Sequence, residues 1–488
     1  MFLKLVSISK LPSLFSANPI NTVSWQQAGL IQFILGIFAY IFSDEVDGGN
    51  WAIVALFLLI SGGSLLPNCY RAIRRPAPIV LSDHLFILTI AYLLYFIFGA
   101  LLLPIGPKNE VDFSLLYYET TASTALKVAG INAIGLGVSL VVSAFAPRKF
   151  FLRLGTTALR LGTNIPIGWV ISGFLLVGSY AYFLVLIFDA DPKPGEVIAG
   201  IWRSLANLLL VAIILAAAYT GKNAKFFRFT AIFLAIIQVV AGFLMLNKAQ
   251  ALLPIVALSI GYGWRLGIRK IALPSGIALA TSFLLIASPV ATVRNVYGSA
   301  SYIDVNTRLT VLWDEIFSEN KNAIESEYYP WARFCYTPAQ VAGMDLYDAG
   351  QGGYDFKNIG WVFLPRFIFP EKPIITSAGQ DIHYNITGYQ NSSTGLGVFV
   401  DGYYNLGIIG VLFSSAIVGL ILGCTSIFAK LAIEKGAVLW FPLALSGDYM
   451  AYRIDGFLLG DYIGPFSLLM YMLIGATIAS SGLKIAEV

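Results

Sequence analysis

Cationic side chains lie at the ends of several apolar segments, where the chain carries few other cations. A charge at membrane depth is unfavourable, so it normally faces a cavity and has a partner. Arginine can hold a phosphate through two parallel, charge-assisted hydrogen bonds because its guanidinium is planar. Together these cations predict a site for a doubly charged anion such as a diphosphate; for each one alone, snorkelling or a local ion pair is the alternative. The candidates are Arg203, Lys248, Arg294, Arg366, Lys372 and Arg453.

Two side chains are the main candidates for accepting a proton from a hydroxyl group. His383 is one of only two histidines, and Asp401 directly precedes an apolar segment. Either an imidazole or a carboxylate can act as the general base on a sugar hydroxyl. For each residue alone, a surface or helix-capping role is the more common one. Further candidates are Glu371, Asp381 and Asp455.

Aromatic residues are concentrated between residues 290 and 395, which include eighteen Phe, Trp and Tyr among 106 residues. Aromatic rings offer flat apolar faces to sugar C–H groups, while an interfacial belt or a small core is the alternative role. Trp361 in this segment, and Tyr403 and Tyr404 shortly after it, are the candidates for glycan binding.

The composition indicates which elements position these side chains. The chain has 488 residues, of which 57% are hydrophobic and 12% charged, and its mean hydropathy is +0.76. Ordinary globular domains contain about 45–50% apolar and about 25% charged residues, which excludes almost any soluble enzyme. The net charge of +4 gives no indication of nucleic-acid binding.

The hydropathy pattern predicts an all-α polytopic membrane protein with about twelve transmembrane helices. Several of these segments are short for a hydrocarbon layer of about 30 Å, which favours tilted or partly re-entrant helices. The predicted spans are 25–42, 51–66, 79–104, 124–145, 166–188, 200–220, 228–246, 249–263, 271–289, 405–428, 437–450 and 456–479.

Lysine and arginine are distributed unequally between the two sides of these spans. Eighteen lie in connections and termini on one side, and six lie in short connections or span ends on the other. Cytoplasmic loops carry the excess of cations, so both termini are predicted to be cytoplasmic and the long connection periplasmic. The protein is thus expected to cross its membrane many times with both termini inside.

The long connection, residues 290–395, is predicted to be a folded extracytoplasmic cap, because a flexible linker would not carry so many aromatic residues. It separates an N-terminal transmembrane bundle of about nine spans, residues 1–289, from C-terminal spans in residues 396–488.

Metal binding and disulfide formation find little support in the sequence. Three cysteines lie in three separate regions, and the acidic groups at 44–47 and 189–191 have a spacing too common to indicate a metal site. Neither a metal ion nor another cofactor is predicted.

Three runs of residues resemble the bacterial O-antigen and oligosaccharide repeat-unit polymerases of the Wzy type. They are NKAQALLPIVAL from Asn247, PRFIFPEKP from Pro365 and VDGYYNLGIIG from Val400. Relatives often show an acidic residue followed by an aromatic residue, Asn and two glycines. Here Asp401, Tyr404, Asn405, Gly407 and Gly410 match that order, with Asp where Glu is common.

The resemblance implies a glycosyltransferase of the GT-C type that uses a polyprenyl (undecaprenyl) diphosphate-linked glycan as donor. The acceptor would be a lipid-linked repeat unit, whose sugar hydroxyl displaces the lipid diphosphate with inversion. The six cations would stabilise that leaving group, and Asp401 or His383 would accept the proton. The family works without metal, and a chain-length regulator protein is an expected partner.

Two other functions remain open from the sequence. An O-antigen ligase shares the fold and the donor but transfers the glycan to a lipid A core. A transporter of lipid-linked oligosaccharides or small solutes would also suit twelve spans, although transporters usually show related halves and broken helices.

Overall fold

A computed structural model describes residues 22–115, 118–161, 165–190, 200–297, 305–317, 330–364, 369, 371–373, 378–388 and 393–485. Within these residues the chain is helical and forms no strand. The chain divides into two compact units, each of which is described by itself. Unit 1 consists of Met1–Leu14, Pro76–Pro78 and Gly162–Pro330, and unit 2 of Phe15–Arg75, Ile79–Leu161 and Trp331–Val488.

The helical membrane fold is confirmed: among the described residues, nine helices are long and apolar enough to cross a bilayer. Helices also form over the other three predicted spans, but these are too short or too polar to be counted with the nine; they are α11 (Gly200–Ala218), α13 (Lys248–Leu266) and α20 (Phe441–Tyr452). The nine candidate spans are Ser24–Glu45, Trp51–Ile73, His84–Ile105, Ala122–Phe145, Ile167–Phe188, Ala224–Leu244, Ile268–Ala287, Val398–Glu434 and Leu458–Ser480.

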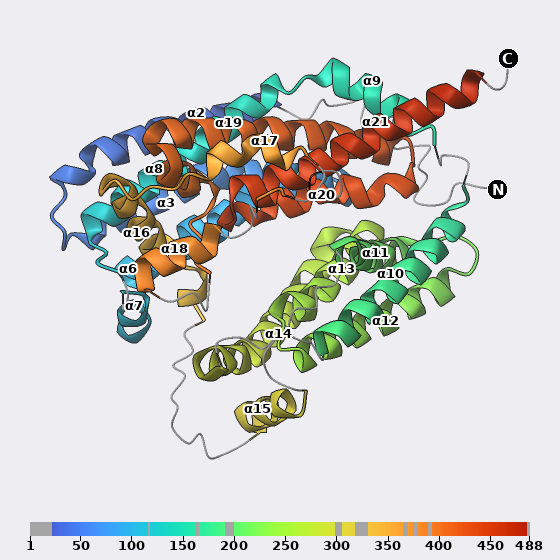
Figure 1. Cartoon of the computed structure of the whole chain (residues 1–488), viewed down its shortest axis with the longest axis horizontal. Helices are drawn as coiled ribbons and strands as arrows, with labels where there is room; N and C mark the ends of the chain where they lie inside the picture. The colour runs from blue at the N-terminus through green and yellow to red at the C-terminus, as the bar shows by residue number, and fades with distance from the viewer. Residues whose placement is uncertain are drawn as a thin grey trace. The chain divides into compact units, whose positions relative to one another are not determined.

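Unit 2 is built around α8 (Ala122–Val142), which packs against α2 (Thr22–Phe42) and α19 (Val398–Glu434) (Figure 1). The helix begins at Thr121, where the Thr121 hydroxyl accepts a hydrogen bond from the Thr124 amide and the Thr124 hydroxyl accepts one from the Thr121 amide. Glycines allow α2 to approach α8 closely, since a methyl group on Gly36 would lie 2.7 Å from the Gly130 carbonyl oxygen.

Further helices, together with α20, complete unit 2 around this centre. The longer of these are α3 (Trp51–Ile73), α5 (His84–Tyr92), α7 (Lys108–Leu115), α9 (Arg148–Ala158), α16 (Thr337–Asp348), α18 (Ala378–Thr387) and α21 (Gly464–Ile485). The short α-helices are α4 (Ala77–Leu81), α6 (Leu102–Ile105) and α17 (Ile359–Val362); α4 begins in unit 1. The 3-10 turns are η2 (Ser43–Glu45), η4 (Ser143–Phe145), η6 (Ala332–Phe334), η7 (Asp355–Asn358), η8 (Val438–Trp440) and η9 (Arg453–Asp455). Two π-helical segments are η3 (Leu93–Phe98) and η10 (Leu458–Ile463).

Unit 1 is a bundle in which successive helices pack side by side (Figure 1). Its helices are α10 (Ile167–Ala190), α11, α12 (Ala224–Leu244), α13, α14 (Ile268–Tyr297) and α15 (Val305–Phe317). Helices α11 and α13 start at the same end of the bundle, because residues near the starts of both line one cavity.

The predicted cap is shared between the two units. Its part up to Pro330, including α15, belongs to unit 1, and its part from Trp331, including α16 and α18, belongs to unit 2. The three predicted segments divide the chain along its sequence, whereas the two units divide it in space.

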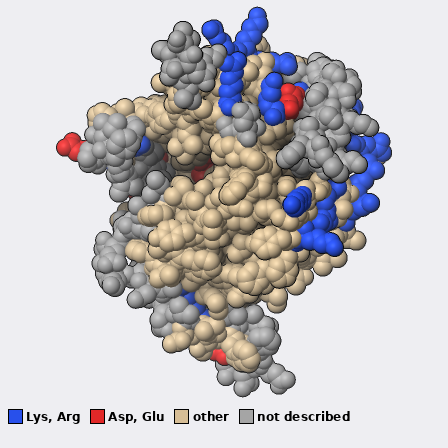
Figure 2. All heavy atoms as spheres, turned by 90° about the vertical axis from the view of Figure 1, so that its right-hand side faces the viewer, with Lys and Arg blue, Asp and Glu red and all other residues tan. Residues whose placement is uncertain are grey.

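Cationic side chains are prominent on one face of the protein. On the face drawn in Figure 2, Lys and Arg side chains gather while few Asp and Glu side chains are visible.

Candidate functional site

Helix α19 carries the Asp401–Gly410 motif and is interrupted within it. Leu406 (φ −146°, ψ 23°) and Gly407 (φ 61°, ψ −148°) both leave the helical conformation. Glycine adopts the positive φ without the steric penalty of a side chain. The segment 398–405 therefore folds back beside the rest of α19: a methyl group on Gly402 would lie 2.5 Å from the Gly410 carbonyl oxygen.

Asp401 holds this folded-back segment in place. Its side chain is 2% exposed. Its Oδ2 accepts a hydrogen bond from the Leu458 amide at 3.0 Å, and its Oδ1 accepts one from the Asn405 side chain at 3.1 Å. Because both oxygens are engaged and buried, Asp401 is placed to position the start of η10 rather than to meet a substrate hydroxyl.

Asn405 extends the same network into the cap. Its side-chain oxygen accepts a hydrogen bond from the Asp355 amide at 2.8 Å. Burial raises the pKa of the Asp355 carboxyl, and the nearby charge of Asp381 raises it further. The motif therefore joins α19 to the residues that follow α16.

Tyr403 and Tyr404 are buried side chains with partners in the cap. The Tyr403 hydroxyl donates to Asp348 Oδ1 at 2.9 Å, and Lys127 Nζ lies 3.2 Å from Asp348 Oδ2. The Tyr404 hydroxyl accepts a hydrogen bond from the Asn385 side chain at 3.5 Å. The two residues are 5% and 4% exposed, respectively, so their rings pack inside unit 2 and present little surface to a sugar.

His383 lies on α18, the helix that also carries Asn385. Its Nδ1 is 3.0 Å from Thr394 Oγ1, and Thr394 in turn donates its amide to the Gly379 carbonyl at 2.9 Å. The imidazole is half-buried. Helix α18 thus brings His383 to the same side of unit 2 as the folded-back start of α19.

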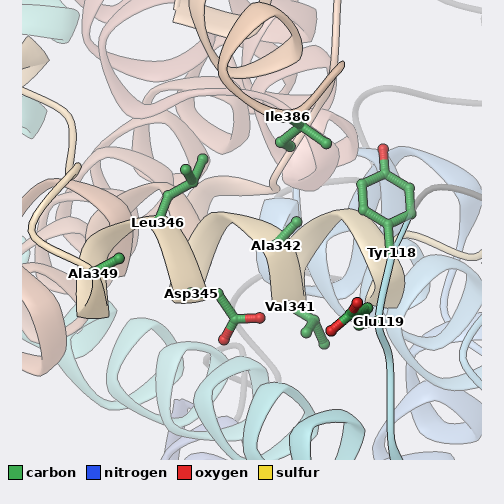
Figure 3. Close-up of a pocket in the computed structure, with 8 residues that line it drawn as sticks. All are labelled: Tyr118, Glu119, Val341, Ala342, Asp345, Leu346, Ala349 and Ile386. Atoms are coloured by element: carbon green, nitrogen blue, oxygen red, sulfur yellow. The ribbon is translucent and has the colours of Figure 1, made fainter. Parts of the chain in front are cut away.

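A cavity of about 340 Å³ lies between the residues before α8 and helices α16 and α18. In Figure 3, the Asp345 and Glu119 carboxylates lie toward one side of α16, and Leu346 and Ile386 toward the other. The lining residues are Tyr118, Glu119, Val341, Ala342, Asp345, Leu346, Ala349 and Ile386.

The cavity combines acceptors with apolar surface. Partial burial raises the pKa of the Asp345 carboxyl, and the charge of Asp348 adds to this effect. Carboxylates accept hydrogen bonds from hydroxyl groups, while apolar side chains pack against C–H groups. The lining is therefore chemically suited to a polyhydroxylated ligand.

Arg453 is paired within unit 2. Its Nε lies 3.1 Å from Asp461 Oδ1 and 3.8 Å from Asp455 Oδ1, and the Tyr336 hydroxyl donates to Asp455 Oδ2 at 3.1 Å. Burial lowers the pKa of Arg453, but the two carboxylates outweigh burial and raise it overall. A diphosphate here would compete with two carboxylates for one guanidinium.

The PRFIFPEKP run is described only in part. Lys372 Nζ donates to the Leu364 carbonyl at 3.1 Å and to the Val362 carbonyl at 3.5 Å. Trp361 is 36% exposed, and its ring centroid lies 6.5 Å from that of Phe369. Arg366 lies outside the described residues.

The remaining predicted cations belong to unit 1. Arg203 lies in the first turn of α11 and lines a cavity there. Lys248 is the first residue of α13, and its Nζ lies 5.6 Å from the centroid of the Phe283 ring. Arg294 belongs to the last turn of α14, with its side chain outside the described part of the chain.

Asp401, Tyr403, Tyr404 and His383 all belong to unit 2, where Asn385, on the helix that carries His383, contacts Tyr404. Arg453 is held by its own acidic neighbours. Sequence reasoning missed the residues of the cavity beside them, Glu119 and Asp345, and the partner Asp348. The one available signal was the spacing of Asp345 and Asp348, which puts both on one face of a helix. No comparable signal marks Glu119.

The described residues contain no group of three or more His, Cys, Asp or Glu side chains placed to hold a metal ion. Comparison of the chain with models of known protein families, with curated proteins and with solved structures gives no match.

Proposed function

We propose that this membrane protein is a glycosyltransferase that polymerises polyprenyl-diphosphate-linked oligosaccharide repeat units into a long-chain bacterial surface polysaccharide of the O-antigen type. The observation that supports it most is the carboxylate-lined cavity beside the folded-back Asp401–Gly410 motif, within a bundle of membrane-spanning helices. The reaction takes place at the outer face of the cytoplasmic membrane, with both termini inside and a chain-length regulator as partner.

In this proposal the cavity holds the acceptor glycan. Glu119 and Asp345 accept hydrogen bonds from its hydroxyls. Trp361, which is 36% exposed in the cap, stays a candidate for a further glycan contact. His383 accepts the proton of the attacking hydroxyl, because its imidazole is half-buried whereas Asp401 is enclosed. Asp401 acts as a positioning residue for the start of η10.

The bond changes follow a single displacement. The acceptor oxygen forms a bond to the anomeric carbon of the donor glycan, the bond from that carbon to the diphosphate oxygen breaks, and His383 takes the proton. The lipid diphosphate leaves with its charge stabilised by Lys372 and Arg366 of unit 2, the unit that carries the cavity. The predicted cations of unit 1, Arg203, Lys248 and Arg294, stay sequence-based candidates for this role. Arg453 is the least suited of the six cations to stabilise the diphosphate, because Asp455 and Asp461 already compensate its charge.

One observation favours transport as a second candidate. Helix α19 is broken at Leu406–Gly407, and two extended residues, Gly456 and Phe457, separate η9 from η10. Interrupted helices are typical of transporters, where their ends surround the substrate. A ligase remains chemically close to the proposal, since it differs only in the acceptor.

Purified protein in liposomes separates these functions. With lipid-linked repeat units as both donor and acceptor, a polymerase produces a ladder of glycan lengths. A ligase gives no product until lipid A core is added. A transporter moves the substrate across the bilayer without changing glycan length, and that result would contradict the proposal.

A further inference from the structure

A second cavity, of about 200 Å³, lies inside unit 1 between α10, α11, α12 and α13. Each of these helices contributes at least one polar side chain, although their sequences are mainly apolar. The polar lining residues are Tyr182, Arg203, Asn207, Gln238 and Gln250.

Several polar atoms in this cavity have no partner among the described residues. They are the Tyr182 hydroxyl and the side-chain oxygens of Gln238 and Gln250. Gln238 is 3% exposed and Tyr182 is 8% exposed, so neither group is open to bulk water. Because a buried polar group without a hydrogen bond is destabilising, three such groups around one cavity point to a ligand that completes them.

The cavity lies near one end of the spans. Gln238 precedes the end of α12 at Leu244 by six residues, and Tyr182 precedes the end of its span at Phe188 by six. At a rise of 1.5 Å per residue, each lies about 9 Å from that end. Arg203 and Gln250 occupy the first turns of α11 and α13. With Arg203 and Gln250 at these helix starts, the rim of the cavity lies where polar headgroups meet the hydrocarbon, and its inner end lies about 9 Å deeper.

We propose that this cavity binds a lipid headgroup in which a phosphate ester carries a hydroxylated substituent. Arg203, at the exposed rim, pairs with the phosphate. The amides of Gln238 and Gln250 and the phenol of Tyr182 hydrogen-bond to the hydroxyls of the substituent. A volume of 200 Å³ corresponds to about six or seven water molecules at roughly 30 Å³ each, which suits a glycerol or a single sugar ring.

Two sources supply this chemistry: a phosphoglycerol lipid of the bilayer, or a polyprenyl-linked sugar phosphate. The proposal concerns binding alone and does not depend on the glycosyltransferase activity. Both sources share a phosphate ester and adjacent hydroxyls, and separate probes distinguish them.

The test measures lipid retention by native mass spectrometry, and lipid-induced thermal shift, on the purified full-length protein in detergent. The probes are phosphatidylglycerol, a polyprenyl-phosphoryl hexose, and phosphatidic acid, which has the phosphate but no hydroxylated substituent. At least one hydroxylated probe should bind about tenfold more tightly than phosphatidic acid, as expected for hydrogen bonds gained in a buried site. The probe that binds identifies the source.

Arg203→Gln should weaken that binding about tenfold or more, because it removes a charge-assisted hydrogen bond. Arg228→Gln is the matched control: Arg228 is the fifth residue of α12, ten residues before Gln238 on that helix, and its Nε donates to the Ala224 carbonyl at 2.9 Å. This control should bind as the wild type does.

Gln238→Leu and Gln250→Leu give the sharper test. Each should abolish the lipid-induced thermal shift and raise the unfolding temperature of the lipid-free protein, since an unpaired amide is removed. A glutamine with a purely structural role would lower that temperature instead. Equal binding of all three probes, no binding of any probe, or unchanged binding in both leucine variants would overturn the proposal.

Discussion

The surroundings of Asp401 in unit 2 and the cavity in unit 1 differ in how their polar groups are paired. In unit 2, the Asp401 carboxylate accepts hydrogen bonds from Leu458 and Asn405, and Arg453 lies beside two carboxylates. In the unit 1 cavity, by contrast, the side-chain oxygens of Gln238 and Gln250 and the Tyr182 hydroxyl have no partner among the described residues.

This difference separates structural from binding roles. A buried group whose hydrogen bonds are all made fixes the geometry around it, and removing one partner leaves the other uncompensated. A buried group that lacks a partner is available to a ligand. Asp401 and Arg453 are therefore interpreted as parts of the frame of unit 2, and the substrate contacts are sought at His383, Glu119 and Asp345.

The largest expected effect is at the folded-back start of α19. Gly410→Val should prevent unit 2 from folding, or lower its free energy of unfolding by about 3 kcal/mol or more, because the side chain would overlap the Gly402 carbonyl oxygen. Folded protein is measured by size-exclusion chromatography and thermal unfolding. Gly475→Val is the control, since a Cβ there meets nothing within 4 Å; equal yields of the two variants would contradict the folded-back geometry.

The next effect concerns chemistry without loss of folding. His383→Ala should lower the polymerisation rate about 10²-fold to 10⁴-fold, as expected on removal of a general base. Protein amount and thermal stability should stay close to the wild type. Tyr384→Ala, on the same helix and 49% exposed, serves as the control. A normal glycan ladder from His383→Ala would remove this residue from the mechanism.

A smaller effect is expected in the acceptor cavity. Asp345→Asn should raise KM for the acceptor about threefold to tenfold at neutral pH, with kcat little changed, because a charged hydrogen-bond acceptor is lost. In the wild type, KM should rise as the pH falls through the raised pKa of Asp345, since the protonated carboxyl accepts hydrogen bonds less well. Asp112→Asn, on α7, is the control. The same rise of KM at low pH in Asp345→Asn and in the wild type would contradict the role of Asp345 in acceptor binding.

The same carboxyl has a predicted effect of opposite sign on stability without substrate. Its pKa is raised in the folded protein, so the folded state binds the proton more tightly than the unfolded state does. Stability should therefore fall as the pH rises from the ordinary pKa through the raised one. Thermal unfolding of Asp345→Asn across this pH range should lack that fall.

The smallest effect is expected for an exposed pair in unit 2. Lys127 lies 3.2 Å from Asp348, and both side chains are partly exposed. Lys127→Met should lower the free energy of unfolding by only about 0.2–1 kcal/mol, and less at high salt, because water and salt screen such pairs. Lys149→Met, an exposed cation on α9, measures the effect of losing a charge alone. A large loss of activity in Lys127→Met would show that this pair does more than support Tyr403.

Hydropathy predicts the helical membrane fold because each span must satisfy its own backbone within the bilayer. The break in α19 was not predicted in the same way, because the sequence on both sides of Gly407 suits a helix. The predicted span begins at residue 405, whereas the helix begins at Val398. Only the close approach of Gly402 and Gly410 shows that the chain reverses there.

The binding groups were harder to predict, because tertiary packing decides which polar side chains find partners. Arg453 and Asp401 are charged residues of the kinds found in binding and catalytic sites, yet each pairs with neighbouring residues in the fold. Gln238 carried a usable signal, as a single amide within an apolar run, since a polar residue at membrane depth usually faces a cavity. Glu119 and Asp345 are far apart in the sequence, so nothing local connects them.

The most direct test of the glycan site is a cryo-electron microscopy map of the protein in nanodiscs with a lipid-linked repeat unit bound. We expect saccharide density against Glu119 and Asp345, with the terminal sugar hydroxyl within hydrogen-bond reach of His383. Asp401 should keep its contacts with Leu458 and Asn405. Saccharide density located between the broken helices of unit 2, with Asp401 turned toward it and the cavity beside α16 empty, would contradict the account.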